Sequence, residues 1–480
     1  MSKEGVKRRD FIWYVGIGAL GVGSSGTSIA FAGNKENGPI NARKAIAETV
    51  FNTGIIDTHE HLPDEKDRLG DRVLIGDKSN DWTFLFSHYL DSDMLSAGMS
   101  ANDYKLFFSP GTDAVEKWRI LEPIWQKVKH TGYAQAVRIT IKELYGIDEL
   151  SEHSVIQLQK AYQSMIAPGF YKKILQEKAN IESCQVNGYP ILKSEMPEFL
   201  MSDLWVDLLI SDVGNNEYAK AAKIEPKLLN DWYRVIDWWF EKYGKYVVAI
   251  KIGMAYSRGI DFLRTSVEEA EPVFNKVIHG KAVSEEERKK LEDHFFWYVV
   301  GQATKMGLPV KMHLGYHAQW AGKTNQMQLS VVRNNPADAC RLCDESKDTR
   351  FIFFHISYPY YEEMLAVAKQ YANATLDMCW SWIINPVAAK DFLKKFIVTV
   401  PSNKILTFGG DYMPVECVLG HSIIARNGIA LALAELVEEN YISLKEALAL
   451  VDPLLNGNAR KIFRLEEKLK IMKNLDWNNI

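Results

Sequence analysis

The sequence predicts an α/β protein folded as a (β/α)8 barrel, and three observations support this fold class. Short apolar stretches rich in β-branched residues alternate with longer segments of helical periodicity, as in repeated βα units. Several stretches, such as 247–250 and 351–354, are continuously apolar, as expected for parallel strands covered by helices. Eight stretches can be counted, the number that closes such a barrel: 54–59, 181–186, 204–210, 246–252, 308–313, 350–355, 374–378 and 404–411.

The connection between the first two strands is much longer than a crossover helix requires. Segment 62–178 carries helical signals, for instance in 151–163, and we predict a mostly helical insertion there. Because the loops that follow barrel strands build the active site, this insertion is expected to lie over the barrel mouth. A second helical excursion, 266–301, contains a capping box that starts at Ser284, and Ser443 opens a later helix in the same way.

Residues 1–32 have the features of an export signal and are set apart from residues 33–480, which form the barrel protein. A basic start that contains Arg8 and Arg9 precedes an apolar stretch broken by glycines. This segment resembles a twin-arginine signal peptide with a cleavage site after Ala32. An uncleaved membrane anchor is the alternative, although the glycine and serine content makes a weak membrane span. We therefore expect an exported, periplasmic protein with no stable membrane span after signal removal.

The composition is that of a soluble globular protein, with 47% hydrophobic and 25% charged residues. The formal net charge of -4 argues against a basic face for phosphate contacts, so we expect a small-molecule substrate and no nucleic acid partner. The 5 cysteines are too few, and odd in number, for a disulfide framework. Cys340 and Cys343 form a C-x-x-C pair that we interpret as buried free thiols, with a structural zinc or redox pair as the alternative. The sequence does not determine the oligomeric state, and a homo-oligomer is compatible with it.

The first strand ends in the motif His59-Glu60-His61. Side chains on a strand alternate between its two faces, so both imidazoles point the same way, toward the barrel mouth. Two imidazoles placed in this manner can chelate one cation. A single His-x-His motif also arises by chance, so its interpretation depends on the rest of the chain.

Three further polar residues end later strands. His313 closes the fifth strand, His355 the sixth and Asp411 the eighth. Before Asp411, Gly409 and Gly410 allow the backbone to approach closely. One such histidine is usually a core residue with satisfied hydrogen bonds, but three strands that end in histidine indicate a shared site. Several imidazoles with one carboxylate suit zinc or another divalent transition metal.

This arrangement resembles the amidohydrolase superfamily, whose pattern is His-x-His after strand one, histidines after strands five and six, and aspartate after strand eight. The resemblance covers 54–465. On segments 251–258 and 355–359 the chain is similar to the branch of uronate isomerases, metal-dependent decarboxylases and nodulin/glutamine synthetase-like amidohydrolase domains. The resemblance implies one divalent metal, with zinc as first choice, held by His59, His61, His313 and Asp411.

The resemblance also implies catalytic roles. Asp411 would accept a proton from the metal-activated water, and His355 would polarise the substrate or shuttle a proton. Lys251 lies on strand four, where binuclear members carry a carboxylated lysine between two metals. A substrate-contacting ammonium and a structural ion pair are the alternatives for Lys251. Two metals per chain are expected only if this lysine is carboxylated.

Three residues near the predicted mouth are candidate substrate contacts. Arg258 and Tyr256 follow strand four and are placed to bind a substrate carboxylate. A solvated surface arginine is the alternative for Arg258. His317 follows His313 at the mouth and is a weaker candidate, because a surface histidine is the more common case.

The function predicted first is a metal-dependent hydrolase that uses metal-activated water on a small polar substrate, such as a lactone, an amide or a carboxylated ring. A metal-dependent decarboxylase, which is a carbon–carbon lyase, or a sugar-acid isomerase would use the same residues. The export signal weakens the isomerase, because uronate catabolism is cytoplasmic in the resembling family. A catalytically silent exported barrel is the remaining alternative, and the intact set of mouth residues counts against it.

Overall fold

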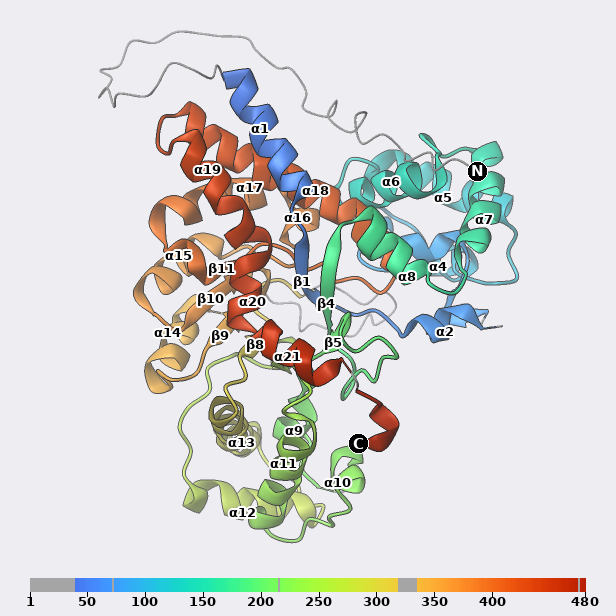
Figure 1. The fold of residues 1–480 in the computed structure, drawn as a ribbon. Helices are drawn as coiled ribbons and strands as arrows, with labels where there is room; N and C mark the ends of the chain where they lie inside the picture. The colour runs from blue at the N-terminus through green and yellow to red at the C-terminus, as the bar shows by residue number, and fades with distance from the viewer. Residues whose placement is uncertain (1–38, 71–72, 215, 318–334, 474) are drawn as a thin grey trace. The chain divides into compact units, whose positions relative to one another are not determined.

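The computed structural model describes residues 39–70, 73–214, 216–317, 335–473 and 475–480 (Figure 1). The predicted export signal, 1–32, lies outside the described residues. Within them, helices outnumber strands, and the strands are short and almost entirely buried.

Eight barrel positions are occupied by parallel strands. Every barrel strand pairs in parallel with its neighbours, first in the order β1-β4-β5 and then in the order β6-β7-β8-β9-β10-β11. Figure 1 shows β1 and β4 side by side. The strands are β1 (Ile55–Glu60), β4 (Ile181–Val186), β5 (Leu200–Ser202), β6 (Leu204–Trp205), β7 (Ile250–Ile252), β8 (Val310–Met312), β9 (Phe351–Phe353), β10 (Ala374–Asp377) and β11 (Ile405–Leu406).

Backbone hydrogen bonds join these strands into a closed ring. Only Asp203 separates β5 from β6, so the two form one barrel position that pairs with β4 on one side and β7 on the other. At the other junction, Thr58 N donates to Phe408 O (3.1 Å) and Asp411 N donates to His59 O (2.8 Å). These bonds attach β1 to the segment that follows β11. The predicted (β/α)8 barrel is confirmed.

Most of the predicted strands are shorter in the structure than in the prediction, and the third and the eighth differ most. The third was expected over 204–210, but it ends at Trp205, and helix α9 (Asp207–Ser211) follows at once. A short apolar stretch fits one face of a helix as well as a buried strand, so periodicity alone could not separate the two. The eighth was expected over 404–411, but only β11 is regular strand. The rest of the predicted stretch leads into a sharp turn at Asp411, where φ is 60.

The segment between β1 and β4 is mostly helical, with one short hairpin. One of its links to the rest of the barrel is a buried ion pair, in which Arg68 Nη2 donates to Glu416 Oε1 (2.8 Å) on α18 (Val415–Glu438). Its elements are α2 (Glu65–Leu69), β2 (Leu74–Ile75), β3 (Lys78–Ser79), η2 (Trp82–Phe86), α3 (Leu90–Ser96), α4 (Ala101–Phe107), α5 (Ala114–Val128), α6 (Gly132–Tyr145), α7 (Glu152–Met165), α8 (Phe170–Lys172) and η3 (Lys173–Lys178).

The remaining helices surround the barrel. The capping boxes predicted at Ser284 and Ser443 are both present. The helices are α1 (Pro39–Asn52), α10 (Glu217–Ala222), α11 (Leu229–Tyr243), η4 (Met254–Tyr256), α12 (Val267–Ile278), α13 (Glu285–Lys305), α14 (Pro336–Glu345), η6 (Phe354–Ser357), α15 (Tyr361–Gln370), α16 (Ser381–Ile384), α17 (Pro386–Thr399), η7 (Ser402–Lys404), α19 (Leu444–Asp452), η8 (Pro453–Gly457), α20 (Asn458–Ile462), α21 (Leu465–Met472) and η9 (Trp477–Asn479).

Two further features bear on the sequence predictions. Helix α18 is the one helix among the described residues that is long and apolar enough to cross a membrane, and 72% of that apolar stretch is buried inside the protein. It therefore has the burial of a core helix. All five cysteines are free thiols; Cys343 is buried, and Cys340 is partly exposed on the same helix, α14.

Candidate active site

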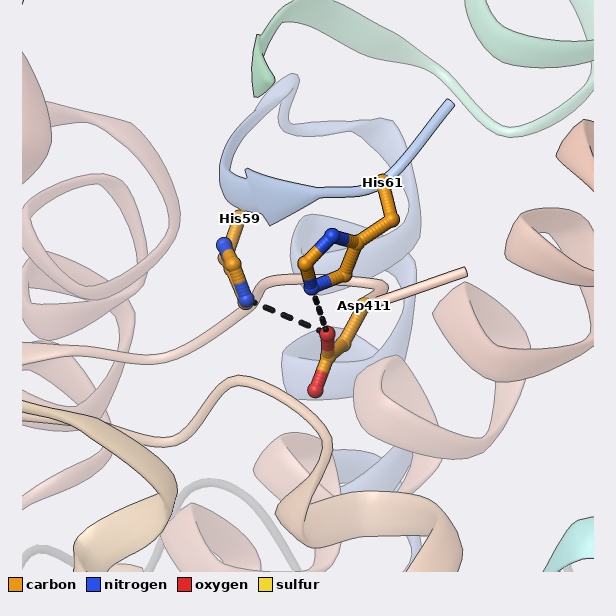
Figure 2. Close-up of side chains that lie close together, drawn as sticks. All are labelled: His59, His61 and Asp411. Carbon is orange, nitrogen blue, oxygen red and sulfur yellow. Dashed lines mark ion pairs between the residues drawn. The ribbon is translucent and has the colours of Figure 1, made fainter. Parts of the chain in front are cut away.

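His59, His61 and Asp411 converge at the mouth of the barrel. His59 Nε2 lies 3.1 Å and His61 Nε2 lies 3.2 Å from the same oxygen, Oδ1 of Asp411. Figure 2 shows the two rings and the carboxylate pointing toward one another. The ligand atoms of the three residues all lie within 4.8 Å of one another. Two imidazole nitrogens and one carboxylate oxygen are a donor set that fits zinc and similar divalent metals.

Burial and hydrogen bonding shift the pKa values of His59 and Asp411. Burial lowers the pKa of His59 well below its usual value, and the charge of Lys251 lowers it further. Burial opposes ionisation of Asp411, but its contact with His59 and hydrogen bonds from both imidazoles hold the pKa of Asp411 well below its usual value. His59 is therefore neutral and Asp411 ionised near neutral pH, as metal ligands must be.

His313 lies beside this three-residue cluster, and its role as a fourth metal ligand stays a prediction. Its Nε2 lies 3.1 Å from the carbonyl oxygen of Tyr316, and its Nδ1 lies 3.0 Å from Nε2 of His355. Both ring nitrogens of His313 are therefore occupied by hydrogen bonds. His355 in turn places Nδ1 3.8 Å from Asp411 Oδ2, and burial lowers the pKa of His355 to about 4. The two histidines form a linked pair beside the cluster.

The turn that carries Asp411 is fixed by close packing. Asp411 has a φ of 60, a conformation that non-glycine residues rarely adopt and that surrounding contacts must maintain. A Cβ added to Gly409 would lie 2.5 Å from the Cβ of Cys379 and 3.1 Å from the Cβ of His59. A Cβ added to Gly410 would meet the carboxylate of Glu60. The two glycines are thus required by the close approach of this turn to β1.

Four consecutive backbone N–H groups of the turn are all bonded. Asp411 N donates to His59 O (2.8 Å), which ties it directly to β1. The other three bonds are made to side chains: Gly410 N to Asp57 Oδ1 (3.3 Å), Tyr412 N to Glu60 Oε2 (2.8 Å) and Met413 N to His88 Nδ1 (3.2 Å). Asp57, Glu60 and His88 were absent from the sequence predictions. The acidic residues around His59 were visible in the sequence, but their partners are 350 residues away.

His421 of α18 supports the same turn and gives stability a pH dependence. Its Nδ1 donates to Gly410 O (3.0 Å), and burial lowers its pKa to about 3. Unfolded histidine titrates near pH ~6.5. Between these values the unfolded chain binds a proton that the folded chain does not, so the free energy of unfolding falls as the pH decreases through this window.

We expect His421 to account for about 2 kcal/mol of the stability lost between about pH 7.5 and about pH 5. His421→Gln keeps a side-chain donor but cannot titrate, so its free energy of unfolding should fall less over this interval. Urea unfolding of both proteins at the two pH values measures the difference. Equal losses in the two proteins would contradict this assignment.

Comparisons with known proteins support the resemblance to the amidohydrolase superfamily. Residues 274–465, less than half of the chain, match the sequence model of the Amidohydrolase family. The chain is 22% identical over 415 residues to a uronate isomerase from Corynebacterium efficiens, and this match covers 79% of this chain and 86% of that protein. It is 23% identical over 237 residues to Protein fluG from Emericella nidulans, covering 46% of this chain but only 26% of that longer protein.

Solved structures share the fold of this chain. The glucuronate isomerase from Caulobacter crescentus superposes with a TM-score of 0.73 at 17% identity, covering 90% of this chain and 96% of the other. The uronate isomerase from Thermotoga maritima gives a TM-score of 0.71 at 13% identity, with 88% and 97% coverage. At these identities the likeness establishes the fold alone. Together with the His59, His61 and Asp411 cluster, the family match supports a metal-dependent enzyme of this superfamily.

Lys251 is buried beside the cluster. Its Nζ lies 3.4 Å from His59 Nε2 and 4.2 Å from the ring centre of Phe354. Burial lowers the pKa of Lys251 below that of an ordinary lysine. The structural ion pair that we considered belongs instead to the next strand, where Lys311 Nζ lies 2.8 Å from Asp203 Oδ2.

A cavity of about 740 Å³ opens at the cluster. The barrel contributes Lys251, Tyr256, His313 and His355 to its wall. The segment between β1 and β4 contributes the opposite wall, which includes Lys78, His88 and Asp91. Those three residues carry no motif in the sequence, so only the folded chain shows that they belong to the site.

Of the three predicted substrate contacts, only Tyr256 is among the described residues that line the cavity. Tyr256 lines the cavity, and its ring centre lies 4.3 Å from that of His313. His317 is buried behind it, with its ring centre 4.8 Å from that of Tyr256. His317 is therefore not the surface histidine that we considered, and it is not among the residues that line the cavity.

Arg258 is not among the described residues that line the cavity, and its contact with substrate stays a prediction. Its guanidinium donates to Glu292 Oε2 (2.9 Å) and Asp293 Oδ1 (2.6 Å), both on α13. Asp293 is only 1% exposed. The charge of Arg258 is thus matched by carboxylates of the protein, and the residue is absent from the cavity wall.

Replacing Arg258 with methionine is therefore expected to affect folding and leave the metal site intact. Removal of one partner from a buried charged hydrogen bond should lower the free energy of unfolding by about 2 kcal/mol. Bound metal per chain and KM should both stay within about twofold of the wild-type values, because Arg258 does not line the cavity. Urea unfolding, elemental analysis and steady-state kinetics measure the three quantities. A large rise in KM at unchanged stability would restore the substrate-binding assignment.

Proposed function

We propose that this protein is a metal-dependent hydrolase that acts on a small polar substrate, such as a lactone, an amide or a carboxylated ring. The observation that carries the proposal is the convergence of His59 and His61 on one carboxylate oxygen of Asp411 at the wall of a cavity. We propose zinc as the metal, with one ion per chain. A second ion would require a carboxylated Lys251, whose lowered pKa favours the neutral amine that such a modification needs.

Side chains at the site can supply the proton transfers of hydrolysis. When bound, a divalent cation polarises a carbonyl group and lowers the pKa of water to about 7. Asp411 is ionised and can accept a proton from the attacking water. His355 lies next to Asp411 Oδ2 and hydrogen-bonds to His313, so it can pass that proton to a leaving group. Tyr256 and His88 line the cavity and can orient the substrate.

A sugar-acid isomerase is the second candidate. It is favoured by the similarity to the uronate isomerase from Corynebacterium efficiens, which extends over 79% of this chain. Isomerisation moves a proton between neighbouring carbons without consuming water, and the same cluster could hold the substrate oxygens. Against it, the described part of the cavity wall contains no arginine to pair with a uronate carboxylate.

Isotope labelling separates the candidates. Zinc-loaded protein is incubated with a panel of lactones, cyclic amides and uronates, once in H₂¹⁸O and once in D₂O. Hydrolysis predicts one ¹⁸O atom in the product carboxyl group. Isomerisation predicts deuterium on carbon and no net uptake of water, and release of carbon dioxide would overturn both. Asp411→Asn protein, treated identically, controls for spontaneous reaction.

We further propose that the enzyme is exported through the twin-arginine pathway. The supporting feature is the basic start with Arg8 and Arg9 before a glycine-rich apolar stretch. A pathway that carries folded proteins would allow the metal to be acquired before export. Fusion of residues 1–32 to a reporter, compared with the same fusion carrying Arg8→Lys and Arg9→Lys, tests this proposal.

A further inference from the structure

The side chain of Asn187 is a buried amide without a partner. It is 5% exposed, and neither Oδ1 nor Nδ2 has a hydrogen-bond partner among the described residues. Buried polar groups in folded proteins are nearly always hydrogen-bonded, because desolvation without compensation is unfavourable. Asn187 also lines the cavity at the metal cluster. A ligand in this cavity is therefore the natural partner for its two polar atoms.

The backbone places Asn187 beside the cluster. Asn187 directly follows β4, and its N–H donates to Glu60 O (2.7 Å), at the end of the neighbouring strand β1. The residue after Glu60 is His61, one of the candidate ligands. The amide is therefore anchored next to the point where a substrate would meet the metal.

Three charged groups of the cavity wall, Lys78, Asp91 and Asp207, already have partners within the protein. Lys78 Nζ lies 2.9 Å from Asp91 Oδ2. Asp207 Oδ1 accepts from Gly253 N at 2.9 Å. The charges of Lys78 and Asp91 therefore compensate each other, and Asp207 already accepts a hydrogen bond. The amide of Asn187 has no such partner among the described residues.

Gln185 shows that an unpartnered amide does not by itself indicate a ligand. It lies two residues before Asn187 on β4, is 0% exposed, and likewise lacks partners for both amide atoms. Gln185 does not line the cavity. The position of Asn187 in the cavity wall distinguishes the two and makes Gln185 a matched control.

We infer that Asn187 is a substrate-binding residue that recognises a hydroxyl group next to the reacting carbonyl. A hydroxyl both donates and accepts, so it can bond to Oδ1 and Nδ2 of the amide together. A carboxylate only accepts, and it would leave Oδ1 unpaired against a negative charge. The inference rests on the proposed function, since it assumes a substrate whose carbonyl meets the metal. It narrows the substrate class to compounds with a hydroxyl beside that carbonyl.

Two small metal-chelating probes test the inference without knowledge of the substrate. Acetohydroxamate and glycolohydroxamate differ by one hydroxyl on the carbon next to the carbonyl. Their dissociation constants are measured by calorimetry on the zinc-loaded full chain. Wild-type protein should bind glycolohydroxamate about tenfold more tightly, as expected for a satisfied buried hydrogen bond. Asn187→Leu should reduce this ratio to about one without weakening acetohydroxamate, and Gln185→Leu should keep the wild-type ratio.

Asn187→Ala removes the amide without adding an apolar side chain, so its ratio of the two dissociation constants must equal that of Asn187→Leu. Thermal unfolding checks that each variant is folded. Equal affinities for the two probes in the wild type would overturn the inference and leave the metal site standing. A preference for glycolohydroxamate that persists in both Asn187 variants would also overturn the inference. Failure of the protein to retain zinc, or to bind either probe with zinc present, would overturn the proposed function itself.

Discussion

Replacement of His59 and His61 together by alanine is expected to remove the metal and abolish turnover. Bound metal should fall from about one ion per chain to less than about a tenth, because two of the three convergent ligands are lost. Loss of the metal should reduce kcat by at least about a thousandfold, since a divalent cation contributes several kcal/mol to transition-state stabilisation. Elemental analysis of the purified full chain and a turnover assay measure the two effects.

A matched control removes two imidazoles far from the site. His153 on α7 and His279 after α12 are both exposed, so His153→Ala with His279→Ala should retain metal and activity. Metal in the wild type that persists in the His59 and His61 double variant would place the site elsewhere. A wild type that binds no metal under any loading condition would leave the barrel intact and favour a catalytically silent binding protein.

Replacement of Gly409 with alanine is expected to damage the site through packing alone. The added Cβ would lie 2.5 Å from the Cβ of Cys379 and 3.1 Å from the backbone nitrogen of His59. None of these atoms is the end of a flexible side chain, so β1 and the turn must move apart. We expect a loss of about 1–3 kcal/mol in the free energy of unfolding. Displacement of His59 from Asp411 should also weaken metal binding by about 10–100-fold.

Gly301→Ala is the control for this prediction. Gly301 lies inside α13, and a Cβ added there would meet nothing within 4 Å. Alanine in place of a helix-interior glycine should raise the free energy of unfolding by about 0.5–1 kcal/mol. Urea unfolding and competition with a metal chelator compare the two variants with the wild type. Gly409→Ala protein with wild-type metal affinity would show that the turn tolerates displacement.

The sequence by itself determined the barrel and the three residues that cluster at its mouth. The strands are local features, because continuous apolar stretches of β-branched residues are recognisable without their partners. His59 and His61 were predictable because alternation along one strand places both on the same face. Asp411 was predictable because strand ends of a parallel barrel meet at one mouth. The resemblance to the family predicted that these three residues share one site, and in the structure their side chains lie together.

Only the tertiary structure decided how the remaining residues are used. His313 bonds to His355 and Tyr316, and Arg258 pairs with two carboxylates of α13, although both residues stand where the sequence pattern favours a role at the site. His88 and Asn187 reach the cavity without any motif. The physical reason is that hydrogen bonds and ion pairs form with whichever groups the fold brings within about 3 Å, often from hundreds of residues away. A pattern in the sequence fixes the strand on which a side chain stands, whereas its partners depend on the packing of all eight strands and the helices around them.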